Sequence, residues 1–249
     1  MLKAGVVSVS FRALSVEEII KITKDAGLEV IEWGSDVHAL PAEKERLIEI
    51  AKLQKEAGLC CSSYGTYFRL GENSTDELIS YIEAAKILGT NVLRLWCGKK
   101  NYENLTDEEK SFIIEESKKA AEIAEREGVI LCMECHRNTF TNSLAGALEL
   151  MKSVNSPAFR MYWQPSLAVD KAANMEYAKA ISPYTVNLHV FYYEDGKACP
   201  LELGLGEWGE YLSCFSGDKH LLLEFMPDKK TESLGREAAS LRKLIESNT

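Results

Sequence analysis

The sequence lacks a surplus of basic residues: 29 Lys and Arg stand against 38 Asp and Glu, which gives a net charge of −9. Proteins that bind the phosphate backbone need a basic face, so this balance argues against a nucleic-acid partner. No apolar run approaches the roughly 20 residues that cross a bilayer, which argues against a membrane partner. The first residues, Met1–Phe11, are too short and too alternating for a signal peptide and are typical of a first strand.

Cysteine pairs and glycine-rich nucleotide motifs are also scarce. The seven cysteines are spread along the chain. Cys132 and Cys135 lie three positions apart on an expected strand, where side chains point to opposite faces, so the pair is a poor chelator of one metal. We expect reduced, mostly buried thiols in a cytoplasmic protein. No GxGxxG follows the first strand, which argues against a dinucleotide-binding fold.

What the sequence does contain is a regular alternation of apolar strands and amphipathic helices. The predicted strands are Ala4–Phe11, Leu28–Trp33, Leu59–Tyr64, Asn91–Trp96, Val129–His136, Phe159–Gln164, Tyr184–Val190 and Lys219–Phe225. The predicted helices are Ser15–Ala26, Pro41–Gly58, Thr75–Leu88, Asp107–Glu127, Asn142–Ser153, Met175–Ile181, Glu207–Phe215 and Thr231–Glu246. Eight strand–helix units without a linker predict an α/β fold, a single (β/α)8 TIM barrel over residues 1–249. A doubly wound open sheet is the alternative.

Polar side chains gather at the C-terminal ends of these strands, where the active sites of such barrels lie. Glu134 and Glu224 are the strongest signal, because each is a carboxylate in an otherwise apolar run and needs a compensating partner when buried. Gln164 and His189 end the two intervening strands. Two carboxylates, an imidazole and an amide oxygen predict a site for Mn²⁺ or Mg²⁺, with Zn²⁺ as the alternative. Buried ion pairs, such as Glu134 with Arg94, are the competing interpretation.

Further side chains near the strand ends are candidates for substrate binding. They are His136, Arg94, Trp96, His38, Tyr64 and Trp163. Aromatic rings often cover the apolar face of a sugar, although packing is the usual role of large aromatics. Alternation favours Trp96 over Trp163, because Trp163 points outward if Gln164 points inward. For His136 the alternative is a hydrogen bond that orients Glu134.

Five short motifs occur in a fixed order along the chain. They are GLEVIEW at 27–33, ECH at 134–136, LHV at 188–190, LGLG at 203–206 and LEF at 223–225. In this order they resemble the sugar phosphate isomerase/epimerase group of the xylose-isomerase-like TIM barrel superfamily, over essentially the whole chain. The resemblance implies a metal held by Glu, Asp, His and Glu, carried here by Glu134, His189 and Glu224. The chain departs where Gln164 replaces the aspartate and Leu167 replaces a following histidine, and a neutral amide binds a divalent ion less tightly than a carboxylate does.

The resemblance also implies a reaction: isomerisation or epimerisation of a sugar or sugar phosphate by proton transfer next to a carbonyl. Glu134 and Glu224 would act as general base and acid on opposite faces of the substrate. No Arg and Lys cluster marks the strand ends, which favours an unphosphorylated sugar.

Several alternatives stay open. A dehydratase acting on a cyclic polyol uses the same first step, and a degenerate metal site would leave a non-catalytic sugar-binding barrel. Four histidines and the net charge of −9 argue against a metal-dependent endonuclease that acts at abasic sites. Related barrels are often dimers or tetramers, which leaves a homo-oligomer open.

Overall fold

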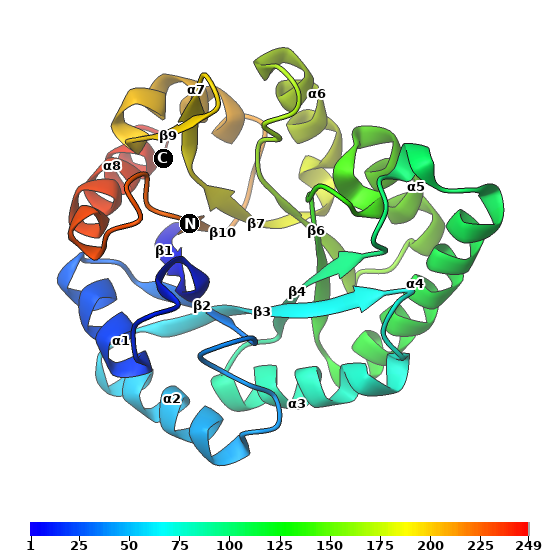
Figure 1. The fold of residues 1–249 in the computed structure, drawn as a ribbon, viewed down its shortest axis with the longest axis horizontal. Helices are drawn as coiled ribbons and strands as arrows, with labels where there is room; N and C mark the ends of the chain where they lie inside the picture. Colours follow the sequence, from blue (N-terminus) through cyan, green and yellow to red (C-terminus); the bar gives the residue numbers. More distant parts are fainter. Residues whose placement is uncertain (249) are drawn as a thin grey trace.

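The computed structural model describes residues 1–248, and within them eight parallel strands close into a barrel in the order β1-β10-β7-β6-β5-β4-β3-β2 (Figure 1). The strands are β1 (Leu2–Val7), β2 (Val30–Gly34), β3 (Cys60–Leu70), β4 (Val92–Cys97), β5 (Ile130–Glu134), β6 (Phe159–Trp163), β7 (Thr185–Val190) and β10 (Lys219–Leu223). The helices are α1 (Val16–Asp25), α2 (Lys44–Glu56), α3 (Leu78–Leu88), α4 (Asp107–Glu127), α5 (Leu144–Val154), α6 (Lys171–Ile181), α7 (Leu205–Leu212) and α8 (Leu234–Glu246). The predicted (β/α)8 barrel is confirmed.

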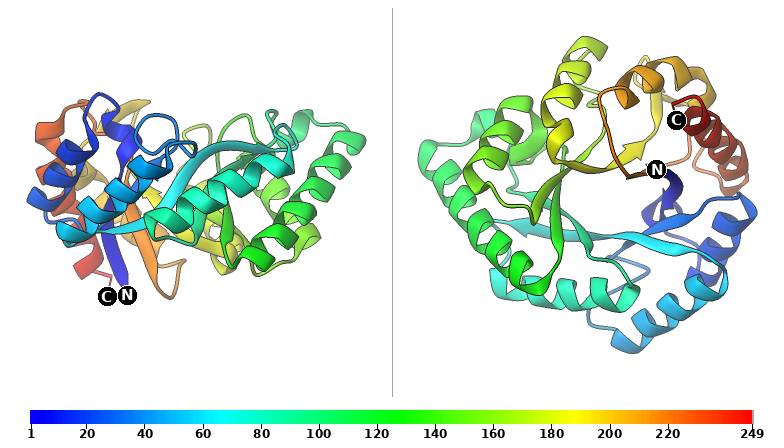
Figure 2. Two further views of the ribbon diagram at one scale, coloured as in Figure 1. Left: turned by 90° about the horizontal axis from the view of Figure 1, so that it is seen from below. Right: turned by 180° about the vertical axis from the view of Figure 1, so that it is seen from behind.

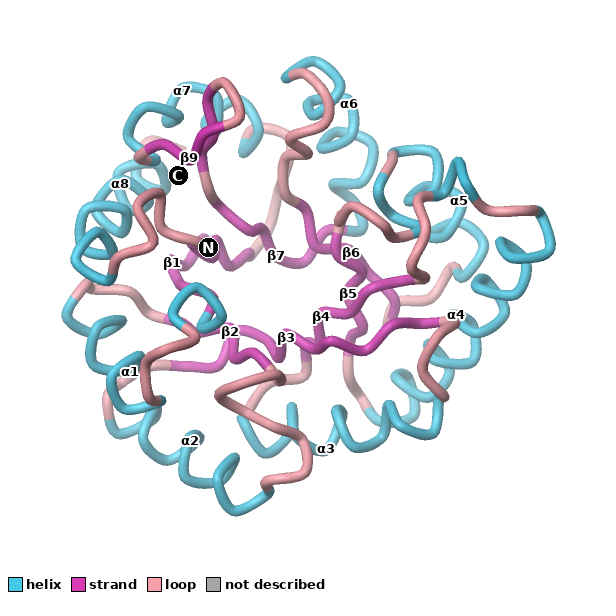
Figure 3. Tube along the Cα trace, in the orientation of Figure 1, coloured by secondary structure: helices cyan, strands magenta, loops and turns pink. Residues whose placement is uncertain are grey.

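The barrel closes where the two ends of the chain meet. β1 pairs with β10 in parallel register from Leu2 opposite Lys219 to Val6 opposite Leu223. Helices form a ring outside the strands (Figure 3), and both termini lie on the same side of the molecule in every view (Figure 2). All eight barrel strands pair in parallel and therefore run in one direction. Their C-terminal ends share one rim, as the sequence interpretation requires.

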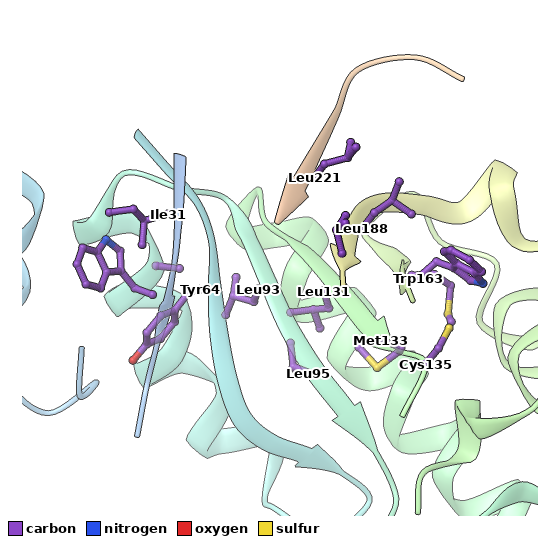
Figure 4. Close-up of a cluster of buried hydrophobic side chains, with 14 of the residues drawn as sticks. Ile31, Tyr64, Leu93, Leu95, Leu131, Met133, Cys135, Trp163, Leu188 and Leu221 are labelled. Carbon is purple, nitrogen blue, oxygen red and sulfur yellow. The ribbon is translucent and has the colours of Figure 1, made fainter. Parts of the chain in front are cut away.

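Side-chain alternation divides the strand residues into two layers. The outer layer packs against the helices and forms most of the core; Figure 4 shows it with Leu131, Met133 and Leu188 among its members. A smaller inner cluster, which includes Cys132 and Leu222, fills the barrel interior. Because inward positions recur every second residue, the polar residues two places further along the same strands point to the interior near its upper rim. Those residues are Glu134 and Glu224.

The structure differs from several of the predicted boundaries; α6, for example, begins at Lys171 and not at Met175. β1 ends at Val7, and Ser8–Phe11, predicted as strand, forms a 3-10 helix. β3 continues to Leu70, well beyond the predicted end at Tyr64. The segment after β7 folds into an antiparallel hairpin, β8 (Tyr192–Glu194) and β9 (Lys197–Cys199), that the sequence interpretation missed.

Among residues 1–248, none of the helices combines the length and the apolar character that crossing a bilayer requires.

Candidate metal and active site

The four predicted metal ligands meet at the upper rim of the barrel. Potential ligand atoms of Glu134, His189 and Glu224 all lie within 4.8 Å of one another, and all three residues are buried. The Nδ1 atom of His189 lies 3.4 Å from a carboxylate oxygen of Glu134 and 3.4 Å from one of Glu224. It also lies 3.1 Å from the side-chain oxygen of Gln164. One imidazole nitrogen therefore faces three oxygens from three other strand ends.

Gln164 is held so that its oxygen turns toward this cluster. Its side-chain amide donates a hydrogen bond to the backbone carbonyl of Cys135 at 3.1 Å, which leaves the amide oxygen facing His189. Gln164 follows β6 directly and points inward, because Tyr162, two residues earlier, belongs to the interior cluster. The position is therefore suited to a neutral oxygen ligand.

Glu134 is held by N–H donors at Oε2, the carboxylate oxygen that does not face Nδ1 of His189. The indole N–H of Trp96 donates to Oε2 at 2.6 Å, and Nη1 of Arg94 lies 3.2 Å from the same oxygen. Burial disfavours the charged carboxylate, but Arg94 and His189 outweigh this effect and lower the pKa of Glu134. The ion pair of Glu134 with Arg94, considered above as an alternative to a metal site, is thus present beside the cluster rather than instead of it.

Glu32, at the end of β2, is a member of the site that the sequence interpretation named only within a motif. Its side chain is fully buried. One carboxylate oxygen accepts a hydrogen bond from Nε of Arg94 at 3.3 Å. The other accepts from the hydroxyl of Ser63 at 2.9 Å and lies 3.4 Å from Nε2 of His189. The sequence does mark this position in the same way as Glu134: Glu32 is a single carboxylate among the apolar residues of Val30–Trp33.

The charges of this network leave it net negative. Burial acts to raise the pKa of Glu32, yet the nearby His189 and Arg94 lower it to about 2. Burial likewise opposes a charge on His189, but Glu224 and Glu32 raise its pKa well above the usual value for histidine. The cations Arg94 and His189 therefore compensate two of the three carboxylates, those of Glu32, Glu134 and Glu224, and one negative charge remains at the barrel mouth.

Above this cluster lies an open cavity of about 670 Å³. Its walls include Glu134, Gln164 and Glu224 together with three of the predicted substrate contacts, Arg94, Trp96 and His136. Six Phe, Tyr and Trp side chains contribute to the lining: Tyr67, Trp96, Tyr177, Phe191, Tyr193 and Phe225. The carboxylates are therefore accessible to a small molecule and are not sealed into ion pairs.

His136 presents one particular nitrogen to this cavity. Its Nδ1 lies 2.7 Å from the backbone carbonyl of Arg137, so Nδ1 carries the proton and donates it to that oxygen. The ring centroid lies 5.2 Å from that of Trp96. Nε2 is therefore the nitrogen left to accept from, or donate to, a bound molecule.

Three predicted substrate contacts are not among the residues that line the cavity. Trp163 belongs to the buried hydrophobic cluster drawn in Figure 4. It points outward, since its neighbour Gln164 points inward, and its ring packs on those of Trp208 and Tyr211. The hydroxyl of Tyr64 donates to the backbone carbonyl of Ala39 in the helix-side core. His38 is also buried: its Nε2 lies 3.2 Å from the carbonyl of Leu14, and its Nδ1 lies 3.2 Å from the hydroxyl of Ser8.

The sequence profile of the xylose isomerase-like TIM barrel family matches residues 20–206. The chain belongs to this family. A curated relative, the 3-dehydroshikimate dehydratase of Bacillus anthracis, is 23% identical over 169 residues, which cover 64% of this chain and 60% of the relative. The match therefore spans about three fifths of that relative's length.

Solved structures share the fold along almost the whole chain. A probable 3-DHS dehydratase of Bacillus anthracis superimposes with a TM-score of 0.79 at 18% identity and covers 97% of this chain and 99% of its own. A D-psicose 3-epimerase of Clostridium cellulolyticum H10 gives 0.72 at 14% identity, with 99% of each chain covered. A Mycobacterium smegmatis barrel in complex with magnesium gives 0.76 at 13% identity, covering 99% of this chain and 98% of its own. Two of these relatives are described as dehydratases and one as an epimerase, and at these identities the structural matches show the shared fold.

Proposed function

We propose that the chain is a divalent-metal-dependent enzyme that moves a proton on a carbon next to a carbonyl group of a small polyhydroxylated substrate. The observation that carries the proposal is the convergence of Glu134, Gln164 and Glu224 on Nδ1 of His189 at the floor of an open cavity. Buried carboxylates that line an open cavity are typical of metal and catalytic sites.

The donor set fits a hard divalent cation. Glu134, Gln164 and Glu224 offer oxygens and His189 offers one nitrogen, a combination that suits Mn²⁺ or Mg²⁺ and tolerates Zn²⁺. When bound, such a cation polarises a carbonyl oxygen and so makes the neighbouring C–H more acidic.

The two carboxylates divide the proton transfer between them. Glu134 is held by N–H donors from Trp96 and Arg94, which stabilise its ionised form. Glu224 makes its one ion-pair contact among residues 1–248 with His189. Because Glu224 lacks such N–H donors, we assign it the abstraction of the proton; Glu134, once it has taken a proton from water in the open cavity, returns a proton from the opposite face.

A second candidate reaction is the dehydration of a cyclic hydroxy-ketone, and it is favoured by the lining of the cavity. Elimination needs a base for the proton next to the carbonyl and an acid for the departing hydroxide. We assign the second proton to Nε2 of His136, which gives it up from the imidazolium form while Nδ1–H still donates to the carbonyl of Arg137. The six Phe, Tyr and Trp rings of the lining suit a flat ring better than an open polyol chain.

A direct assay tests both reactions. Metal-stripped protein is supplied with Mn²⁺, Mg²⁺ or Zn²⁺ and incubated in D₂O with D-psicose, D-tagatose or 3-dehydroshikimate. Epimerisation places deuterium on the carbon next to the carbonyl, whereas dehydration yields a conjugated product with a new ultraviolet absorbance. Absence of exchange and of product with every metal and substrate, in protein that shows no metal-dependent rise in melting temperature, would contradict the proposal.

Replacement of Gln164 is expected to show that this position is a ligand. Gln164→Asp adds a negative charge to the oxygen set and should tighten Mn²⁺ binding by about tenfold, because ligand charge sets affinity in oxygen sites. Gln164→Asn is the matched control, since it has the same shape as the aspartate without its charge, and should bind more weakly than the wild type. Titration calorimetry measures both; equal affinities for the Asp and Asn variants would place Gln164 outside the coordination sphere.

A further inference from the structure

Glu32 stands at the centre of the polar network although it does not face the cavity. The residue comes from β2, whereas His189 comes from β7, and β1 and β10 lie between these strands in the barrel. The contact between the Glu32 carboxylate and Nε2 of His189, at 3.4 Å, therefore crosses the barrel interior. Glu32 is not among the residues that line the cavity.

We infer that Glu32 is a positioning residue, which orients the His189 ring so that Nδ1, and not Nε2, is offered to the cation. The inference rests on the proposed function. An imidazole binds a metal through one nitrogen, and the hydrogen bond made by the other nitrogen decides which one is free. With Nε2–H donating to Glu32, Nδ1 is the nitrogen that faces the oxygens of Glu134 and Glu224.

Glu32 positions a second ligand through Arg94. One oxygen of Glu32 accepts from Nε of Arg94 at 3.3 Å, and Nη1 of the same guanidinium reaches Glu134 at 3.2 Å. The charge of Glu32 also compensates that of Arg94, so the two remaining carboxylates, Glu134 and Glu224, match the charge of a divalent cation. Loss of the Glu32 charge would leave an uncompensated guanidinium beside that cation.

The surrounding backbone is built to leave space for this carboxylate. A Cβ atom at Gly65 would lie 2.6 Å from Oε1 of Glu32 and 2.9 Å from Nη2 of Arg94, closer than any side chain tolerates. Ser63, two residues earlier, donates its hydroxyl to the other oxygen at 2.9 Å. In β3, Gly65 therefore leaves space for the Glu32 carboxylate, and Ser63 holds it by a hydrogen bond.

Glu32→Gln is the variant that tests the inference. A carboxylate accepts from Arg94 on one oxygen and from His189 on the other, whereas an amide must turn its NH₂ toward one of these donors. We expect the dissociation constant for Mg²⁺ or Zn²⁺ to rise by about 10- to 100-fold, as for other partners of metal-bound histidines. Glu72→Gln, the same substitution at an exposed carboxylate that pairs with Lys99, is the matched control and should leave the affinity unchanged.

Nitrogen chemical shifts of His189 supply a readout that a purely structural role would not move. In Zn²⁺-loaded wild type we expect Nε2 protonated and Nδ1 metal-bound, and in Glu32→Gln a mixture of the two arrangements. Should Glu32→Gln fail to fold, Gly65→Ala crowds the same carboxylate without altering any charge and should weaken metal binding as well. If the wild type binds no metal, the proposed function is wrong. If the wild type binds metal, but Glu32→Gln has the same dissociation constant within twofold and the same His189 nitrogen shifts, this inference alone is wrong.

Discussion

Glu134→Gln and Glu224→Gln are each expected to lower kcat by about 10²- to 10⁴-fold, the range that a positioned general acid or base supplies. Glutamine keeps the shape of glutamate and one oxygen, so each variant removes a proton acceptor while leaving the cavity intact. Because we also propose both residues as metal ligands, the rates must be compared at saturating Mn²⁺. Glu72→Gln, which alters an exposed carboxylate paired with Lys99, is the matched control and should retain wild-type turnover.

Isotope exchange separates the two carboxylates from each other. With a substrate epimer whose proton faces Glu224, Glu224→Gln should lose both turnover and solvent exchange of that proton. Glu134→Gln should lose turnover yet retain exchange, because abstraction by Glu224 still occurs and the proton returns to the same face. Unchanged turnover in both variants would remove these residues from the catalytic role.

The fold and the convergence of the main candidate ligands could be predicted because both follow from alternation within single strands. Inward positions recur every second residue, so Cys132 in the interior cluster places Glu134 in the interior, and Leu222 does the same for Glu224. A carboxylate inside an apolar run then stands out without any knowledge of its neighbours. The closure of the barrel brings together strand ends that this local pattern had already marked.

Features that depend on the register between strands could not be predicted from alternation within a single strand. Ile31 pairs with Cys61 but Glu32 pairs with Ser63, so β3 contains one additional residue at that point. This bulge shifts the alternation of β3, and Tyr64 turns to the helix side next to Trp33, away from the cavity. The partnership of Glu32 with His189 was hidden for a related reason, because it joins strands that are not adjacent.

Arg94→Met is expected to destabilise the metal-free protein by about 3–5 kcal/mol, because removing one partner of a buried ion pair leaves the others uncompensated. Arg94 is 2% exposed and contacts Glu32 and Glu134, which would then have His189 alone as a shared cationic neighbour. Arg12→Met is the matched control: Arg12 pairs with Asp36 at the exposed rim, where an ion pair is worth about 0–1 kcal/mol. Urea unfolding in the presence of a chelator measures both.

The pH dependence of the stability lost in Arg94→Met identifies the cause of that destabilisation. In the wild type the pKa of Glu32 is lowered to about 2, so the stability from its ionised form is present above the usual glutamate range and is lost as pH falls toward 2. Without Arg94, Glu32 and Glu134 should take up protons at higher pH, and protonation relieves their repulsion. The difference between variant and wild type should therefore be largest near pH 7 and shrink below pH 5. A difference that stays constant across this range would instead indicate lost packing by the Arg94 side chain.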